Sequence, residues 1–273
     1  MSFMIPKLED IEIELFNWAP KFLAEEWDNC GLQVGDPESK VKKILIALDA
    51  SEETFIAALK EQADLVISHH PLIFTPIKSL NLTDSTTRLL AGFLRHDIGL
   101  ISMHTNLDSV KGGVNDKLCK LIGLKETKPL LPNKTDPEQG LGRIGTLPNI
   151  LTGATLLAHI STILSKNNLL YAGDKNKKIK KVAVCSGSGS TLFDIALESE
   201  ADAFVTGEIK HSIALKARAN NIFVIDAGHF HTEHPVVDDL AKYLQKIKGD
   251  KEWDVEISIF KHESSPLNLW IKD

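Results

Sequence analysis

A stretch of the chain recurs 138 residues later without a gap, and this repeat constrains the fold more than any other feature. Residues 42–68 align with residues 180–206, and seven of the 27 aligned positions are identical, among them Asp64 with Asp202. Chance similarity between two strand-helix-strand units is the alternative. The gapless run and a similar third strand in each half favour duplication. We therefore expect two related α/β units.

Apolar runs rich in β-branched residues alternate with segments of helical spacing in the first repeat. The runs are residues 42–49, 63–68 and 98–103, and the helical segments are residues 51–62 and 85–96. Short apolar strands separated by helices are typical of parallel strands buried on both faces. The sequence thus predicts an α/β fold with two related domains, mainly parallel sheets and right-handed crossovers.

The composition of the middle of the chain suggests where the two domains meet. We expect an N-terminal α/β domain over residues 1–125 and a second α/β domain over residues 126–273. Residues 126–172 are rich in Pro, Gly and Asn, which indicates a linker and a hairpin, with one amphipathic helix over residues 152–165. A further expectation is that the C-terminal segment packs back on the first domain.

Charge and composition exclude several classes of protein. The 273 residues contain 31 basic and 37 acidic side chains, a net charge of −6, which argues against a nucleic-acid-binding surface. No apolar run approaches the roughly 18 residues of a membrane span. The N-terminus is acidic by Glu9 and lacks the order of a signal peptide, so we expect a cytoplasmic protein. The three cysteines form no C-x-x-C pair, so a bound metal would need His, Asp and Glu ligands.

Six of the ten histidines fall in three short stretches, each beginning where a predicted strand ends. They are His69, His70, His104, His229, His231 and His234. In open α/β sheets, ligands bind at the carboxyl ends of the strands. We therefore expect these loops to converge.

The adjacent pair His69 and His70 closes the second predicted strand. Neighbouring residues of a strand point to opposite faces, so the pair would serve two metal ions, or one metal ion and one supporting role. The plain alternative, two polar residues that end a strand, is about equally favoured by the dipeptide alone.

Two carboxylates accompany the histidines. Asp108 follows the third strand, and Glu233 lies four residues after His229, just before a predicted helix. A solvated turn explains Asp108 alone, and a helix start explains Glu233 alone. Together, His69, His70, Asp108, His229 and Glu233 suit two divalent ions such as Zn²⁺, Fe²⁺ or Mn²⁺, with one carboxylate able to bridge them. Such a site activates water, so the implied chemistry is metal-assisted hydrolysis.

Other side chains are candidates for catalysis and substrate binding. His104 and Glu208 are candidate acid or base groups, and His104 can instead support a metal ligand. Lys210, His211 and Arg143 are candidates to bind a substrate phosphate. The alternatives are a solvated helix start for Glu208, Lys210 and His211, and a surface position for Arg143.

Eight motifs together resemble the NIF-three-like dinuclear-metal family, whose bacterial members are called GTP cyclohydrolase I type 2 homologues. They are WDNCGLQVGD (27–36), ISHHPLIF (67–74), HTNLD (104–108), GGVND (112–116), GLGRIG (140–145), SGSGS (186–190), TGEIKH (206–211) and GHFHTE (228–233). The resemblance covers nearly the whole chain. It implies two related α/β domains, a toroidal homohexamer, and a two-metal cleft between the domains with the same five ligands.

The leading hypothesis is a cytoplasmic dimetal hydrolase that acts on a nucleotide-like or phosphorylated small molecule. Opening of the purine ring of GTP fits this chemistry, and the choice of GTP rests on the resemblance. The alternative is a ring-forming metal-binding or regulatory protein with protein partners. We expect no membrane or nucleic-acid partner in either case.

Overall fold

The computed structural model describes residues 4–270, which divide into two compact units. Unit 1 comprises the described residues up to Leu107 together with Val236–Glu263, and unit 2 comprises Asp108–Pro235 with the described residues from Ser264 onward. Among the described residues, none of the helices has both the length and the apolar character needed to cross a membrane.

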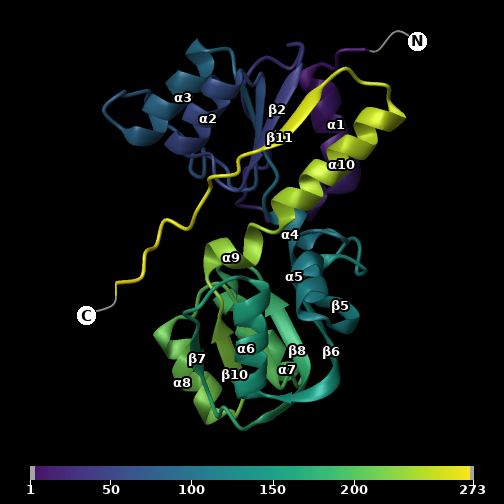
Figure 1. Cartoon of the computed structure of the whole chain (residues 1–273), viewed down its shortest axis with the longest axis vertical. Coiled ribbons are helices and arrows are strands. Elements are labelled where there is room, and N and C mark those ends of the chain that lie inside the picture. The colour runs from purple at the N-terminus through teal and green to yellow at the C-terminus, as the bar shows by residue number, and fades with distance from the viewer. Residues whose placement is uncertain (1–3, 271–273) are drawn as a thin grey trace. The chain divides into compact units, whose positions relative to one another are not determined.

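Unit 1 is a five-stranded sheet with helices. In chain order its elements are α1 (Leu8–Trp18), η1 (Lys21–Leu23), β1 (Gly31–Val34), β2 (Lys43–Ala47), α2 (Glu52–Glu61), β3 (Leu65–Ser68), α3 (Ser85–Arg95), β4 (Gly99–Ser102), α10 (Val236–Asp250) and β11 (Glu256–Ile259). The strand order is β1-β4-β3-β2-β11, and all neighbours are parallel except β1 with β4. Figure 1 shows α10 and β11, from late in the chain, beside α1 and β2.

Unit 2 contains a six-stranded mixed sheet. The short helix α4 (Thr105–Ser109) spans the division between the units, and the elements that follow it are α5 (Val114–Ile122), β5 (Lys125–Pro132), β6 (Gly140–Thr152), α6 (Gly153–Ile163), β7 (Leu170–Ala172), β8 (Lys178–Cys185), η2 (Gly189–Leu192), α7 (Phe193–Glu198), β9 (Ala203–Thr206), α8 (His211–Ala219), β10 (Phe223–Asp226) and α9 (His229–Glu233). The strand order is β5-β6-β8-β9-β10-β7, with β8, β9 and β10 parallel.

The sequence repeat is a structural repeat. In the first half, Asp64 Oδ2 accepts hydrogen bonds from the backbone N–H groups of Lys42 at 2.7 Å and Lys43 at 2.9 Å. Asp202 makes the same two bonds, each at 2.9 Å, with the lysine pair of the second half. Each aspartate fixes the start of a parallel strand, which explains why it is shared by both halves.

The strand registers of the two halves also agree. The aligned positions are Ile44, Leu65 and Gly99 across β2, β3 and β4, and Val182, Ala203 and Phe223 across β8, β9 and β10. The first two positions keep the offset of the sequence repeat. Related α/β units with three parallel strands at their centre are therefore confirmed.

Helix caps and a hairpin occur where the sequence predicts them. Ser51 caps α2 by accepting from Thr54 N at 3.1 Å, and Thr152 caps α6 by accepting from Thr155 N at 3.1 Å. The predicted hairpin after residue 126 is the antiparallel pair β5 and β6. Compared with the expected division at residue 125, α5 lies in unit 2, whereas α10 and β11 lie in unit 1 because β11 pairs with β2.

Buried apolar side chains cover the sheets. In unit 1 one cluster contains Leu45, Val66, Leu100 and Phe93, the last from α3. In unit 2 the sheet has a cluster on each face, one around Val182 and the other around Phe204. The central strands are thus buried on both faces, and the loops at their carboxyl ends are left to carry polar groups.

Candidate metal-binding site

Three histidines of unit 1 lie together at the carboxyl ends of β3 and β4. His69 and His70 follow β3, and His104 follows β4. The ring centroids are 4.9 Å apart for His69 and His70, 5.3 Å for His69 and His104, and 5.6 Å for His70 and His104. One ring nitrogen of each lies within 4.8 Å of one ring nitrogen of each of the others. We call these three residues the histidine cluster.

The strand β3 ends at Ser68, so His69 and His70 both belong to the loop that follows it. The alternation of side chains along a strand therefore does not decide where the two rings point. Their ring planes are inclined at 50° to each other.

Backbone and carboxylate oxygens fix the orientation of His69 and His70. His69 is fully buried, and its Nδ1 lies 2.7 Å from the carbonyl oxygen of Met103. His70 Nδ1 lies 2.7 Å from Oδ1 of Asp49. Both oxygens accept only, so each Nδ1 carries the proton and each Nε2 carries the lone pair. This is the tautomer that binds a metal ion through Nε2.

Asp28 orients His104 in the same way. Its side chain has no solvent exposure, and Oδ1 lies 2.8 Å from His104 Nδ1. The other donors to this carboxylate are Asn29 N at 2.7 Å, Cys30 Sγ at 2.9 Å, Thr105 N at 3.0 Å and Thr105 Oγ1. Burial alone would raise the pKa of Asp28, but the hydrogen bond and charge of His104 with the other donors hold it well below its usual value.

Cys30 beside this carboxylate is not a nucleophile. Burial and the hydrogen bond to Asp28 raise the pKa of its thiol to about 12. The thiolate that nucleophilic catalysis would need is therefore disfavoured.

Unit 2 carries a second group, formed by His229 and Glu233 of α9 together with Glu208. His229 Nε2 lies 3.0 Å from Oε2 of Glu233, one helical turn away, and its Nδ1 lies 2.7 Å from Oε1 of Glu208. Gly228 precedes the helix with φ +83°, a conformation that favours glycine. Glu208, a candidate acid or base from its sequence position, thus orients His229 as Asp49 orients His70.

Asp108 and Glu233 both lie near the carboxyl end of β8. Burial, then Asp108, then Glu233 raise the pKa of the Cys185 thiol at the end of that strand. A Cβ atom added at Gly187 would lie 2.0 Å from Oε1 of Glu233 and 3.3 Å from Nε2 of His229. A side chain at residue 187 would therefore displace the carboxylate of Glu233 and strain a backbone whose φ is +57°.

The candidate phosphate-binding residues lie in different surroundings. Lys210 and His211 are exposed at the start of α8. Arg143 is 2% exposed, and its five N–H groups donate to Asp116 and to backbone carbonyls. The acceptors are Asp116 Oδ1 and Oδ2 and the carbonyls of Gly140, Gly142, Ser109 and Val110. Arg143 therefore joins strand β6 to the segment after α4, and its donors are committed to the protein.

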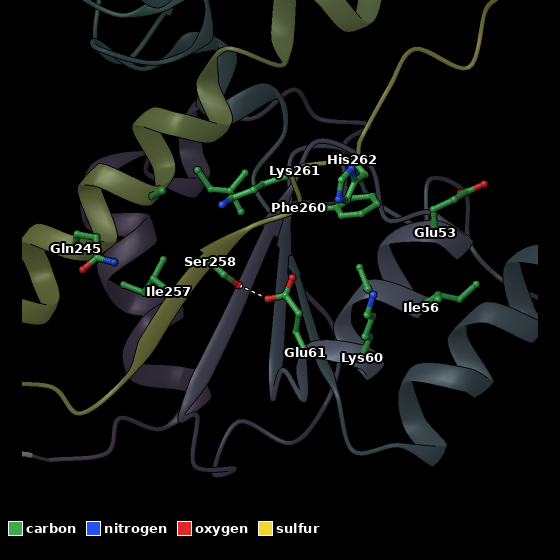
Figure 2. A pocket seen from close by; sticks show the side chains of 13 residues that line it. Glu53, Ile56, Lys60, Glu61, Gln245, Ile257, Ser258, Phe260, Lys261 and His262 are labelled. Atoms are coloured by element: carbon green, nitrogen blue, oxygen red, sulfur yellow. Dashed lines mark hydrogen bonds between the residues drawn. The ribbon is translucent and has the colours of Figure 1, made fainter.

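A hollow of about 840 Å³ lies elsewhere in unit 1 (Figure 2). It is lined by Ile56 of α2, Gln245 of α10 and the edge strand β11, where Ser258 Oγ donates to Glu61 at 2.8 Å. No member of the histidine cluster lines it.

The donor chemistry fits a divalent metal. In unit 1 the donors are imidazoles that offer Nε2, and within unit 2 they are one imidazole and carboxylates. Mixed nitrogen and oxygen donors suit Zn²⁺, Fe²⁺ or Mn²⁺ better than Ca²⁺ or Mg²⁺, which favour oxygen. The oxygen partners behind the rings are those that metal-binding histidines normally have.

Sequence reasoning missed the partner of His70. Asp49 lies two residues after β2, at the same edge of the sheet as the histidines. The rule that polar residues after parallel strands converge applied to Asp49 as well. The partner of His69, the backbone carbonyl of Met103, could not be predicted from the sequence, because every residue has a backbone carbonyl.

Comparison with known proteins identifies the family of the chain. The model of the Duf34/NIF3 (NGG1p interacting factor 3) family matches residues 6–266. The chain belongs to this family. Relatives include a protein of Clostridium perfringens, 36% identical over 96% of this chain and 99% of its own, and one of Methanocaldococcus jannaschii, 36% identical over 91% and 98%. Both are called GTP cyclohydrolase 1 type 2 homolog.

Solved structures of other proteins share the fold. A Bacillus cereus protein related to NIF3 superposes with a TM-score of 0.92 at 24% identity, over 97% of this chain and all of its own. A Staphylococcus aureus protein described as hypothetical superposes with a TM-score of 0.91 at 29% identity, over 98% of this chain and all of its own.

Proposed function

We propose that this protein is a hydrolase that uses two divalent metal ions, held by His69, His70, Asp108, His229 and Glu233. One observation carries the proposal: the Nδ1 atoms of His69, His70 and His229 each lie 2.7 Å from an oxygen that only accepts. Oxygen partners that hold the Nδ1 protons leave Nε2 of these rings as the nitrogen that can bind a metal ion, which is expected of metal ligands and is not needed in surface residues.

The metal ions would supply Lewis acidity and activated water. The chain supplies orientation. Met103, Asp49 and Glu208 each hold Nδ1 of one of the three proposed ligand histidines, which would keep the rings oriented for a bound metal ion. The low exposure of His69 and Glu233, at 0% and 4%, limits the access of bulk water.

His104 is the proposed proton carrier. Asp28 holds the proton on Nδ1, so exchange with a substrate takes place at Nε2. The buried carboxylate also stabilises the imidazolium that forms when Nε2 gains a proton. This is the role of the aspartate in the hydrolytic triad. His104 can instead complete a coordination sphere with His69 and His70, since its nitrogen lies within reach of theirs.

The proposed substrate is a nucleotide-like or phosphorylated small molecule. The support is the printed name of the relatives, GTP cyclohydrolase 1 type 2 homolog. Addition of water to a C–N double bond is a reaction that activated water performs, and Lys210 and His211 are proposed to contact a phosphate. We further propose a homohexameric ring, to be tested by light scattering after size-exclusion chromatography.

The decisive experiment combines metal analysis with activity. Protein purified without chelator or added metal is analysed for metal content, then loaded with two equivalents and assayed on GTP and a panel of phosphate esters. We expect metal-dependent turnover in the wild type and its loss in Asp108→Ala and His69→Ala, with unchanged oligomer mass. The matched control is His96→Ala, at an exposed histidine outside the cluster.

The outcomes separate the two functions. Absence of metal-dependent turnover on every substrate contradicts the hydrolase. Dissociation of the oligomer in Asp108→Ala, together with metal loss, supports a structural or regulatory role of the metal with protein partners.

A further inference from the structure

We propose that Trp27 and Phe74 form a stacking platform for the planar heterocyclic ring of the substrate, next to the histidine cluster. The inference rests on the proposed function, because it names the part of a nucleotide-like substrate that the site recognises. Both side chains lie in unit 1 among the described residues.

The two aromatic rings are exposed beside a buried polar site. Trp27 is 57% exposed and Phe74 is 55% exposed. Their ring centroids are 5.5 Å apart, and they lie 6.0 Å and 6.4 Å from the ring of His104. The rings are thus in contact with each other and with a member of the histidine cluster, while much of each surface faces solvent.

The platform is held in place by a polar network between its two loops. Asn29 Nδ2 donates to the carbonyl of Ile73 at 2.8 Å and to Gln33 Oε1 at 3.2 Å. Gln33 Oε1 also accepts from Ile73 N at 3.2 Å, and Gln33 Nε2 donates to the carbonyl of Asn29 at 2.6 Å. These bonds tie the loop before β1 to the loop after β3, so the two aromatic residues do not depend on a ligand for their placement.

Asp28 links the platform to the site. It directly follows Trp27, and its buried carboxylate holds Nδ1 of His104. A ring stacked on Trp27 or Phe74 would therefore lie beside the residue that we propose to exchange protons. Preorganised groups of this kind lower the cost of binding.

The chemistry of the platform selects the ligand. Two exposed aromatic faces offer no charged group to a phosphate or a sugar, but they stack readily on a purine or another flat heterocycle. Stacking tolerates many ring types, so the platform would hold the ring in place. Hydrogen bonds from other groups to the edge of the ring would then distinguish one heterocycle from another. A second copy of the chain is the other occupant that exposed aromatic rings can have.

The experiment measures binding rather than turnover. Metal-loaded wild-type protein, Trp27→Ala, Trp27→Phe and Phe74→Ala are titrated by calorimetry with GTP, guanosine, ribose 5-phosphate and inorganic triphosphate. We expect Trp27→Ala and Phe74→Ala to weaken GTP and guanosine binding about 5- to 100-fold. Trp27→Phe should retain most of the affinity, and the ring-free probes should bind all variants alike. The matched control is Trp270→Ala, at a tryptophan that is 81% exposed.

Several results would overturn the proposal. They are a wild type that binds neither GTP nor guanosine, equal GTP affinity in Trp27→Ala, or equal weakening of the ring-free probes. A smaller oligomer in Trp27→Ala would show that a second copy covers the platform. If Trp27→Ala binds guanosine more weakly than the wild type but the wild type shows no turnover, the hydrolase proposal is refuted and the stacking platform is supported.

Discussion

Nδ1 of His104 lies 2.8 Å from Oδ1 of Asp28, a carboxylate whose side chain is wholly buried. A buried carboxylate behind an imidazole fixes its tautomer and raises its basicity as a ligand or proton acceptor. The other three oriented histidines, His69, His70 and His229, have a carbonyl or a more exposed carboxylate in that place. Asp28 is therefore the supporting residue whose charge should matter most.

Asp28→Asn should weaken metal binding or proton transfer at the histidine cluster. The variant keeps the shape of the side chain but removes the charge and places an amide donor among hydrogen-bond donors. We expect a loss of about 10- to 100-fold in metal affinity or in kcat. Competition with a chelating dye measures the affinity, and Asp250→Asn on the exposed end of α10 is the control. Unchanged affinity and unchanged kcat would show that Asp28 only anchors its loop.

Gly187→Ala should displace Glu233. The added Cβ would lie 2.0 Å from Glu233 Oε1 at a backbone φ of +57°. We expect about 10- to 100-fold weaker metal binding. Gly123→Ala is a sharp control because its φ is +85° and nothing lies within 4 Å of the added atom. That variant should lose only about 1–2 kcal/mol of stability through backbone strain. Metal affinity that is unchanged in both variants would contradict the position of Glu233.

Arg143→Met should destabilise the protein rather than weaken substrate binding. It removes the buried guanidinium, which lies 2.8 Å from the partly exposed Asp116, and leaves four backbone carbonyls without their donor. The expected loss is at least about 1–3 kcal/mol in the free energy of unfolding, measured in urea. Arg218→Met on the exposed face of α8 should have little effect. A raised KM for phosphate esters with unchanged stability would instead favour substrate binding.

Glu14 should make the stability of unit 1 depend on pH. The contact with Lys251 Nζ at 2.7 Å, helped by a hydrogen bond from Asn17 Nδ2 at 3.3 Å, lowers the pKa of this carboxyl below 4.5. A lowered pKa in the folded state means that the stabilisation is present above about pH 4.5 and is lost as the pH falls through the folded pKa. Lys251 is half exposed, so solvent screens the pair and we expect only a small contribution to the free energy of unfolding.

Comparison of the wild type with Glu14→Gln checks this dependence. The difference in thermal midpoint should be constant near neutral pH and should shrink below about pH 4.5. Glu252→Gln, at an exposed carboxylate after α10, is the control. A difference that grows as the pH falls would mean that the sign of the pKa shift is wrong.

The sequence by itself determined the repeated units and their strands. The offset of 138 residues recurs in the paired hydrogen bonds of Asp64 and Asp202, and caps such as Ser51 begin helices at the expected residues. These features depend on local periodicity and on contacts of fixed spacing, which a sequence displays directly. The same reasoning selected His69, His70 and His104, because parallel strands end at one edge of a sheet.

Only the tertiary structure decided which oxygen accepts from each histidine ring and which charged side chains are free to meet a substrate. Asp49 lies 21 residues before His70, and Asp28 lies 76 residues before His104, so no local pattern links either carboxylate to its histidine. Arg143 looks like a surface residue in the sequence, yet its donors are enclosed by carbonyls that only the folded chain brings together. Burial and hydrogen-bond partners are properties of packing between distant segments, and they separate a residue that meets a substrate from one that holds the protein together.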